Sequence, residues 1–308
     1  MAHRLLSAAV ERLENSVSER ILGVIGGSGV YALDMLEGAR RIEVETPWGP
    51  PSGAVVAGRI AGVETRFMAR HGQGHRLPPS SVNYRANIDA LKRAGATDVL
   101  SVSACGSLRE GLAPGCFVLC DQFIDRTSGR EKSFFGEGFV AHVSMAEPTC
   151  PALRAALAAS CAALSIPYAT SGTYIAIDGP QFSTRAESHL YRSWGADVIG
   201  MTNMPEARLA REAELPYATV AMVTDYDCWR EGEKAVEVSD VLAVMKSNTE
   251  KARALVADIA ARLGPTRAAS PLGIETVLDY AVITAPEARD PAMAAKLDAV
   301  AGRFLRKA

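Results

Sequence analysis

The chain has 308 residues, of which 48% are apolar and 22% are charged, and it carries a formal net charge of −2 at pH 7. This length and composition are typical of a globular protein with one large α/β domain or two smaller ones. A charge balance so close to neutral excludes broad electrostatic attraction to nucleic acid or to an anionic membrane, so any anion must be bound by local groups.

The cysteines and the N-terminal residues indicate the cellular compartment of the protein. Cysteines lie in apolar runs such as CFVLC at 116–120, which predicts free thiols in a reduced, cytoplasmic protein. Cys116 and Cys120 lack a second Cys/His pair at zinc-ligand spacing, so we expect no metal. No apolar run reaches the roughly 20 residues that span a bilayer. Glu11 and Glu14 interrupt the N-terminal apolar residues too early for a targeting signal, and residues 1–20 are expected to form an amphipathic helical extension.

From residue 21 onward, strand-like apolar runs alternate with helical patterns, which favours an α/β fold. The absence of internal repeats and low-complexity linkers predicts one domain over 21–263. A flexible break at GPTRAASPLG then begins a partly helical extension, 264–308. The predicted strands are 21–26, 40–45, 65–69, 98–104, 116–124, 173–177, 196–199 and 217–223, and the predicted helices are 83–93, 151–164, one opening near 183, 205–213 and 239–263.

The segment LGVIGGSGVYAL, residues 22–33, leads a predicted strand into a glycine-rich turn. Glycines let backbone N–H groups converge on a phosphate. The same residues fit the dinucleotide fingerprint Gly27-x-Gly29-x-x-Ala32, with Glu45 as the ribose-binding acid. Only about ten residues precede the next predicted strand, which is short for a crossover helix. A phosphate loop and a plain tight turn are both consistent with this pattern.

Three further segments after predicted strands carry groups that can bind an anion. Arg70 and His71 in ARHGQGH supply a planar guanidinium and an imidazole, although Arg70 could also pair with a surface carboxylate. SACGSL at 103–108 offers backbone amides and a hydroxyl, or is a plain turn. In GMTNMPE, Thr202 or Asn203 caps a helix opening at Pro205 or binds a ligand there.

Two acids follow the most apolar predicted strand, in MVTDYDCW. Asp225 and Asp227 are two residues apart, so in an extended segment their side chains can point to the same face. Neighbouring carboxylates repel each other, which favours protonation of one of them and makes the pair a candidate for general-acid work. The alternative is that both are solvated in a loop. No nucleophile elbow, Walker loop or His-Glu-x-x-His motif accompanies them.

Nine motifs occur in one order: GGSG, RHGQGH, VNYRANI, ACGSLREG, DQFIDRTSGR, MAEP, GPQFSTRAES, WGADVIGMTNMPE and TDYDCW. In these, the chain resembles the purine nucleoside phosphorylase family, in particular its methylthioadenosine-cleaving members, over residues 22–262, with both termini outside the likeness. The resemblance implies a single α/β domain whose central mixed sheet closes partly into a barrel and is flanked by helices. It also implies a homotrimer, or a dimer of trimers, with active sites near subunit boundaries and no nucleic-acid or membrane partner.

The implied reaction is the reversible phosphorolysis of 5′-methylthioadenosine to adenine and 5-methylthioribose 1-phosphate, a step of methionine and purine salvage. Inorganic phosphate is the co-substrate, and no cofactor is needed. Phosphate attacks C1′ while Asp225 shares a proton with purine N7 and Asp227 accepts a bond from the 6-amino group. The implied phosphate ligands are Ser28, Arg70, His71, Ser103, Ala104 and Thr202. The implied nucleoside contacts are Met201 at the ribose, Phe182 and Ser183 near the base, Val238 and Val241 at the methylthio group, and His142 from the neighbouring subunit.

Three positions depart from the family pattern. Ser28 replaces a common threonine but keeps the hydroxyl, Gly200 stands where many members carry a polar residue, and Gln181 replaces a frequent arginine. GMTNMPE is also similar to a methylthioinosine-cleaving branch, which lacks TDYDCW. The alternatives are therefore a 6-oxopurine nucleoside or methylthioinosine phosphorylase and, outside this family, a dinucleotide-binding protein.

Overall fold

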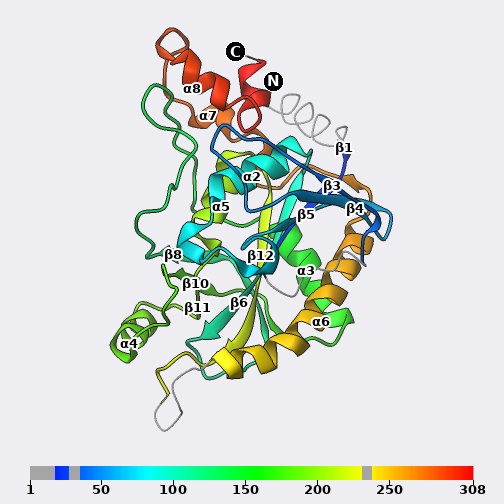
Figure 1. Cartoon of the computed structure of the whole chain (residues 1–308), viewed down its shortest axis with the longest axis vertical. Helices are drawn as coiled ribbons and strands as arrows, with labels where there is room; N and C mark the ends of the chain where they lie inside the picture. The colour runs from blue at the N-terminus through cyan, green and yellow to red at the C-terminus, as the bar shows by residue number, and fades with distance from the viewer. Residues whose placement is uncertain (1–17, 28–34, 231–237, 308) are drawn as a thin grey trace, which may run out of the picture.

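The computed structural model describes residues 18–27, 35–230 and 238–307, apart from the side chains of 238–241 and 243. Its described strands build a mixed sheet centred on β6 (Asp98–Ser107) (Figure 1). β6 lies parallel to β2 (Ile21–Gly26) and to β12 (Tyr217–Asp225), and its last residues pair antiparallel with β11 (Val198–Gly200). The other members are β3 (Glu37–Ile42), β4 (Val55–Ile60), β5 (Val63–Ala69), β7 (Phe117–Cys120), β8 (Gln122–Asp125), β9 (Tyr168–Ala169) and β10 (Thr173–Ala176).

The sheet confirms the predicted mixed α/β class. Among the described strands the pairing branches at β6, and no strand pairing closes it into a barrel. The first described strand after the glycine-rich loop, β3, pairs antiparallel with β4, which pairs antiparallel with β5. A dinucleotide-binding unit needs a parallel strand after its glycine loop, and this connectivity argues against one. β3 also begins and ends three residues earlier than the predicted 40–45 strand.

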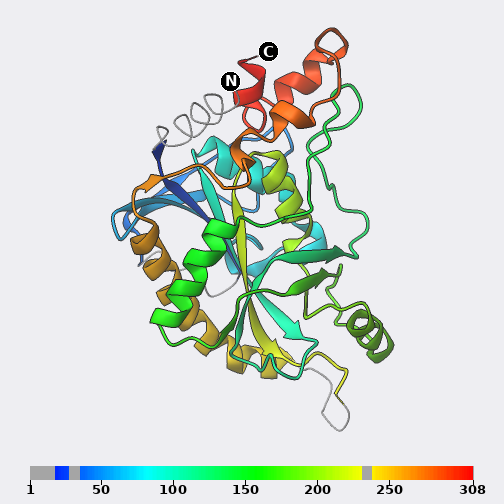
Figure 2. The ribbon, with the colours of Figure 1, turned by 180° about the vertical axis from the view of Figure 1, so that it is seen from behind.

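Helices cover both faces of the sheet (Figures 1 and 2). On one face α2 (Tyr84–Arg93) packs beside α5 (Asn203–Glu212), and on the other α3 (Pro151–Ala163) packs beside α6 (Val238–Leu263). The Asn83 side chain caps α2 by accepting from Ala86 N at 3.1 Å. α4 (Arg185–Ser193), which starts with a capping box, projects from the body. Within the described residues, no helix is both long and apolar enough to cross a membrane.

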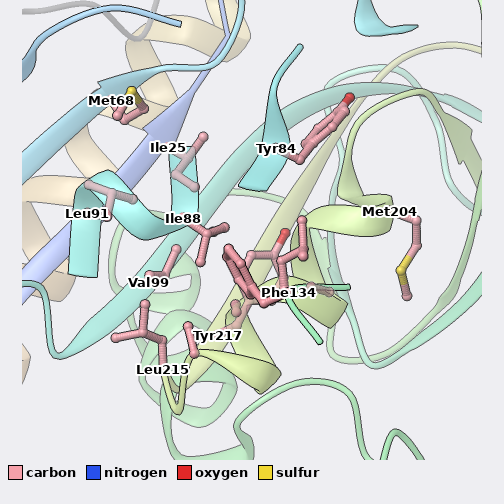
Figure 3. Close-up of a cluster of buried hydrophobic side chains, with 14 of the residues drawn as sticks. Ile25, Met68, Tyr84, Ile88, Leu91, Val99, Phe134, Met204, Leu215 and Tyr217 are labelled. Atoms are coloured by element: carbon pink, nitrogen blue, oxygen red, sulfur yellow. The ribbon is translucent and has the colours of Figure 1, made fainter. Parts of the chain in front are cut away.

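Each face of the sheet has its own apolar core. Figure 3 draws part of the core under α2 and α5, where Ile88 and Leu91 of α2 gather with Ile25, Val99 and Tyr217 of the sheet strands. The second core joins Leu157 of α3 and Leu255 of α6 to the opposite face. The six cysteines are free, as predicted, and four of them are buried.

The segments flanking the sheet differ from the prediction. Residues 18–19 form a strand, β1 (Ser18–Glu19), and not the end of a helix; residues 1–17 lie outside the described residues. β1 pairs antiparallel with β13 (Thr266–Arg267), inside the expected flexible break. Arg267 Nε forms an ion pair with Asp98 Oδ2 at 3.1 Å, so opposite charges hold this segment to the domain. Beyond it lie α7 (Leu278–Ala281), α8 (Pro291–Lys296), α9 (Gly302–Leu305) and short 3₁₀ turns at Ile274–Thr276 and Pro286–Ala288; two others lie earlier, at Gln73–His75 and Pro79–Ser81.

A buried carboxylate fastens the segment after β8 to α5. Glu212 accepts bonds from Phe134 N at 2.7 Å and from the Ser133 hydroxyl at 2.8 Å. Burial disfavours its charged form and raises the pKa of Glu212 to about 7, although these two bonds lower it. Because the pKa in the folded state lies above the ordinary value of 4.5, the stability that Glu212 contributes is fully present below that value and is lost as the pH rises through about 7.

We therefore expect the free energy of unfolding of the wild type to fall, relative to that of Glu212→Gln, by about 3 kcal/mol over this interval. Glutamine stays neutral at every pH and removes the titration. Chemical denaturation at a series of pH values measures the difference. Glu110→Gln, at an exposed position, is the control and should follow the wild-type pH dependence. Parallel curves for the wild type and Glu212→Gln would contradict the expectation.

Candidate active site

A cavity of about 970 Å³ opens where several strands of the sheet end. In an open α/β sheet such a position is the usual ligand crevice. Gly27 at the end of β2 lines it, as does Leu242 of α6. The cavity brings together ten residues implicated by the sequence: Arg70, His71, Ser103, Ala104, Phe182, Ser183, Met201, Thr202, Asp225 and Asp227.

For three other predicted residues, the structure does not describe a side-chain position. Ser28 lies outside the described residues. Val238 and Val241 belong to the first turn of α6, but their side chains lie outside the description. The roles of these three residues stay predictions.

Arg70 is 1% exposed and is held in a buried ion pair. Its Nε donates to Glu206 Oε2 at 2.8 Å and its Nη2 donates to Glu206 Oε1 at 3.1 Å. Nη2 also donates to the Ser101 hydroxyl at 2.7 Å, and Nη1 donates to Val102 O at 3.1 Å. Four of the five guanidinium N–H groups thus have partners among the described residues, and one Nη1 hydrogen remains for a ligand.

The ion pair changes the interpretation of Arg70. The sequence alternatives are a phosphate ligand or a surface pair, whereas the structure has a buried pair on the cavity wall. Glu206 is 2% exposed and also accepts from Tyr217 Oη at 2.9 Å. Sequence reasoning missed both Glu206 and Tyr217, because no local pattern joins residues 136 positions apart. The charge of Arg70 is therefore largely balanced before any ligand binds.

The tautomer of the His71 ring follows from a hydrogen bond to the backbone. Its Nδ1 lies 2.9 Å from Leu77 O, and since a carbonyl oxygen only accepts, Nδ1 carries the proton. Nε2 is then a hydrogen-bond acceptor. Burial lowers the pKa of His71 to about 4, and the positive charge of Arg70 lowers it further. The ring also stacks on His75, with centroids 4.2 Å apart.

The hydroxyl candidates have distinct partners. Ser103 Oγ donates to Asn203 Oδ1 at 3.1 Å, and Asn203 Nδ2 donates to Thr219 Oγ1 at 2.7 Å. Asn203 thus supports the site from a fully buried position. Thr202 stands at the N-cap position of α5, but its side chain makes no capping bond. The interpretation of Thr202 as an ordinary side-chain N-cap is therefore wrong, and Thr202 lines the cavity.

The two acids lie together where β12 ends. A bulge in the β6–β12 pairing places Asp225 opposite Gly106, and a Cβ at Gly106 would stand 2.9 Å from Asp225 Oδ1. Asp225 accepts from the Thr224 hydroxyl at 2.6 Å and from Asp227 N at 2.8 Å. Burial raises the pKa of both acids, and the charge of Asp225 raises that of Asp227 further. The expectation of a carboxylate pair with favoured protonation is thus supported, and solvation in a loop is not.

The structure explains one departure from the family pattern. A Cβ at Gly200 would lie 2.0 Å from Tyr174 Oη. That phenol is fully buried and accepts from Thr202 N at 3.4 Å. Tyr174 thus occupies the space that a side chain at position 200 needs. Gln181 lines a second cavity, of about 550 Å³, and not the first.

His142 is not among the described residues that line the cavity of its own chain. It is exposed, and its backbone N donates to Ala281 O at 2.9 Å. Ile283 N donates to Val140 O at 3.0 Å, so the C-terminal extension runs beside this segment. Within the described residues, no group of three or more His, Cys, Asp or Glu side chains is arranged to hold a metal ion.

Comparisons with known proteins agree with this architecture. The model of the Phosphorylase superfamily matches residues 21–261. An S-methyl-5′-thioadenosine phosphorylase of Bradyrhizobium diazoefficiens is 58% identical over 290 residues, which cover 94% of this chain and 100% of the relative. One of Rhodospirillum rubrum is 57% identical, covering 95% of this chain and 100% of the relative. The chain belongs to the phosphorylase superfamily and, within it, to the family of methylthioadenosine phosphorylases.

Solved structures agree with this assignment. A crystal structure of a methylthioadenosine phosphorylase from an antarctic soil metagenomic library has a TM-score of 0.86 and 45% identity, covering 92% of this chain and 99% of that one. The methylthioadenosine phosphorylase of Schistosoma mansoni in complex with adenine has a TM-score of 0.76 and 39% identity, covering 80% and 92%. Matches over 94% of the chain include most of the segment after residue 263, so the likeness reaches further than the predicted 22–262.

Proposed function

We propose that the protein catalyses the reversible phosphorolysis of 5′-methylthioadenosine to adenine and 5-methylthioribose 1-phosphate. The observation that carries this proposal is the pair of acids, half-buried Asp225 and buried Asp227, on the wall of the cavity that also holds Arg70 and Thr202. Carboxylates with raised pKa suit an adenine leaving group, because they can share a proton with N7 and accept from the 6-amino group. The names of the relatives point to the same substrate.

The anion end of the cavity suits phosphate that carries a proton. Arg70 offers one N–H group and Thr202 a hydroxyl, while the neutral His71 ring offers the Nε2 lone pair. A P–OH group of hydrogen phosphate can donate to that nitrogen. Phosphate bound there attacks C1′ as the glycosidic bond loosens, and its negative charge stabilises the positive charge that develops on the ribose.

One assay tests the function. Purified protein should release adenine from 5′-methylthioadenosine only when phosphate is present, and hypoxanthine from inosine slowly or not at all. Release without phosphate would indicate a hydrolase. Faster cleavage of inosine or methylthioinosine would favour the 6-oxopurine alternatives. No metal or organic cofactor should be required, which activity after dialysis against a chelator checks.

We further propose a homotrimer, or a dimer of trimers, in the cytoplasm, in which His142 serves the methylthio pocket of a neighbouring subunit. Support comes from the exposure of His142 and from its absence from the described wall of its own cavity. The free cysteines support the compartment. Partial closure of the sheet into a barrel is part of the same proposal, supported by the branching at β6.

Mixed oligomers test the role of His142. Asp225→Ala subunits and His142→Ala subunits are each expected to be poorly active, but their mixture should regain activity. A site with Asp225 from one chain and His142 from its neighbour is complete only in the mixture. The control mixes Asp225→Ala subunits with subunits that carry both Asp225→Ala and His142→Ala. This mixture should give no recovery of activity. No recovery in the first mixture, with subunit exchange verified by mass spectrometry, would assign His142 to its own chain's site or to none.

A further inference from the structure

Arg130 ends the motif DQFIDRTSGR, and its side chain is 2% exposed. Its Nη1 donates to Met201 O at 2.7 Å and to Met204 O at 2.9 Å. Its Nη2 donates to Asp178 O at 3.0 Å and to Ile177 O at 3.3 Å. One guanidinium therefore collects backbone carbonyls from two separate segments of the chain.

Both segments form walls of the cavity. Ile177 directly follows β10, and Met201 directly follows β11; both line the cavity, as does Thr202. Their backbone carbonyls turn toward Arg130, which itself is not on the described cavity wall. Fixing Met201 O and Met204 O fixes the backbone on both sides of Thr202. The placement of Thr202 on the cavity wall thus depends on a residue that is not on the described wall.

Tyr84 adds a third cavity segment to the same cation. Arg130 Nη1 donates to Tyr84 Oη at 3.1 Å, and the guanidinium carbon lies 5.3 Å from the centre of the Tyr84 ring. The phenol in turn donates to Pro79 O at 3.0 Å, and Pro79 lines the cavity. Arg130 and Tyr84 together connect the segments at 79–84, 177–178 and 201–204.

The positive charge of Arg130 is paired with a carboxylate at the Nε side of its guanidinium group. Its Nε lies 3.3 Å from Asp178 Oδ1, and that carboxylate also accepts from Ser128 N and the Ser128 hydroxyl. A buried cation is costly unless hydrogen bonds satisfy it. A planar fork with five N–H groups can reach carbonyls on two sides, whereas the compact ammonium of lysine has three N–H groups at one point.

We propose that Arg130 is a positioning residue for the reaction: it sets the relative placement of the Met201–Thr202 segment and the Ile177–Asp178 segment, and thereby the binding of both phosphate and nucleoside. This inference rests on the proposed function. Because Arg130 acts on binding geometry and not on proton transfer, its loss should weaken substrate and transition state alike, which raises KM with little change in kcat.

The test compares Arg130→Lys with Arg66→Lys. Arg66 is a matched control, because it is also buried, donates to two backbone carbonyls, Ala94 O at 2.9 Å and Thr65 O at 3.0 Å, and pairs with Glu64, but lies off the described cavity wall. For Arg130→Lys we expect KM for phosphate and for 5′-methylthioadenosine to rise about tenfold each, the equivalent of one charged hydrogen bond. We expect kcat to change less than about threefold. Arg66→Lys should lower the unfolding temperature comparably and leave both KM values unchanged.

Two further measurements keep the test decisive. Tyr84→Phe removes one acceptor of Arg130 and the bond to Pro79, and should shift both KM values in the same direction by a smaller factor. Thermal stabilisation by inorganic phosphate reports binding without catalysis and should need more phosphate in Arg130→Lys than in Arg66→Lys. If wild type cleaves the nucleoside but both arginine variants keep wild-type KM values and phosphate midpoints, or if Arg130→Lys loses only kcat, the positioning role is overturned. If wild type shows no phosphorolysis, the proposed function itself fails.

Discussion

Asp225→Asn is expected to lower adenine release from 5′-methylthioadenosine by about 10²- to 10⁴-fold, the usual contribution of a positioned general acid. The substitution removes the proton-sharing carboxyl but spares the fold. The carbonyl oxygen of the introduced asparagine can still accept from Asp227 N, which lies 2.8 Å from Asp225 Oδ1 in the wild type. Its amide group can donate to Thr224 Oγ1, which lies 2.6 Å from Asp225 Oδ2. The neutral amide also needs no desolvation of a charge, so stability should not fall.

The same variant should shift the choice of base. An amide donates to a carbonyl oxygen and cannot protonate adenine, and a mismatched buried partner costs about 1–3 kcal/mol. The ratio of kcat/KM for inosine to that for 5′-methylthioadenosine should therefore rise at least about tenfold, even if both values fall. Asp197→Asn is the control, since Asp197 also accepts a backbone bond, from Thr173 N at 2.8 Å, but lies off the described cavity wall. An unchanged ratio with equal losses on both substrates would make Asp225 a general electrostatic residue.

The predicted core elements of the fold follow from strong periodic patterns. Long apolar runs located β2, β6 and β12, and the predicted helix 83–93 begins within one residue of α2. The patterns failed at short elements, at an edge strand and at β4, which is buried inside the sheet but was not predicted. β3 pairs on one side only and is almost fully exposed, so burial did not mark its ends. β1 and β13 have two residues each, too few for any periodicity.

Arg70, His71 and the two acids were predictable as candidates because their motifs come where predicted strands end. Phe182, Ser183 and Met201 were implied only by the family resemblance. What the motifs could not supply is the partner of each group. Nothing near Arg70 in the sequence indicates that Glu206 neutralises it, and nothing near His71 indicates that Leu77 O fixes its tautomer. Arg130 lies in a quoted motif, but its role depends on carbonyls 47 to 74 residues away. Long-range polar contacts of this kind leave no local periodic signal.

Arg70→Met is expected to lower both stability and phosphate affinity, for separate reasons. Removing the cation leaves Glu206, 2% exposed, with Tyr217 Oη as its remaining described hydrogen-bond donor. Breaking a buried pair in this way costs about 3–5 kcal/mol. Loss of the remaining Nη1 hydrogen and of the charge should weaken phosphate binding by about one to two decades. Measured alone, either loss could be mistaken for the other.

A double variant separates the two effects. In Arg70→Met/Glu206→Gln neither position of this pair carries a charge, and the introduced glutamine can still accept from Tyr217 Oη. Much of the lost stability should therefore return. The KM for phosphate should stay raised, because the ligand for the anion is still absent. Arg109→Met is the control: its side chain is 51% exposed and pairs with Asp197, so it should cost at most about 1 kcal/mol and leave phosphate binding unchanged. If the double variant regains the wild-type KM for phosphate together with its stability, Arg70 acts only through the folding of the cavity wall, and the anion is bound by the other groups there.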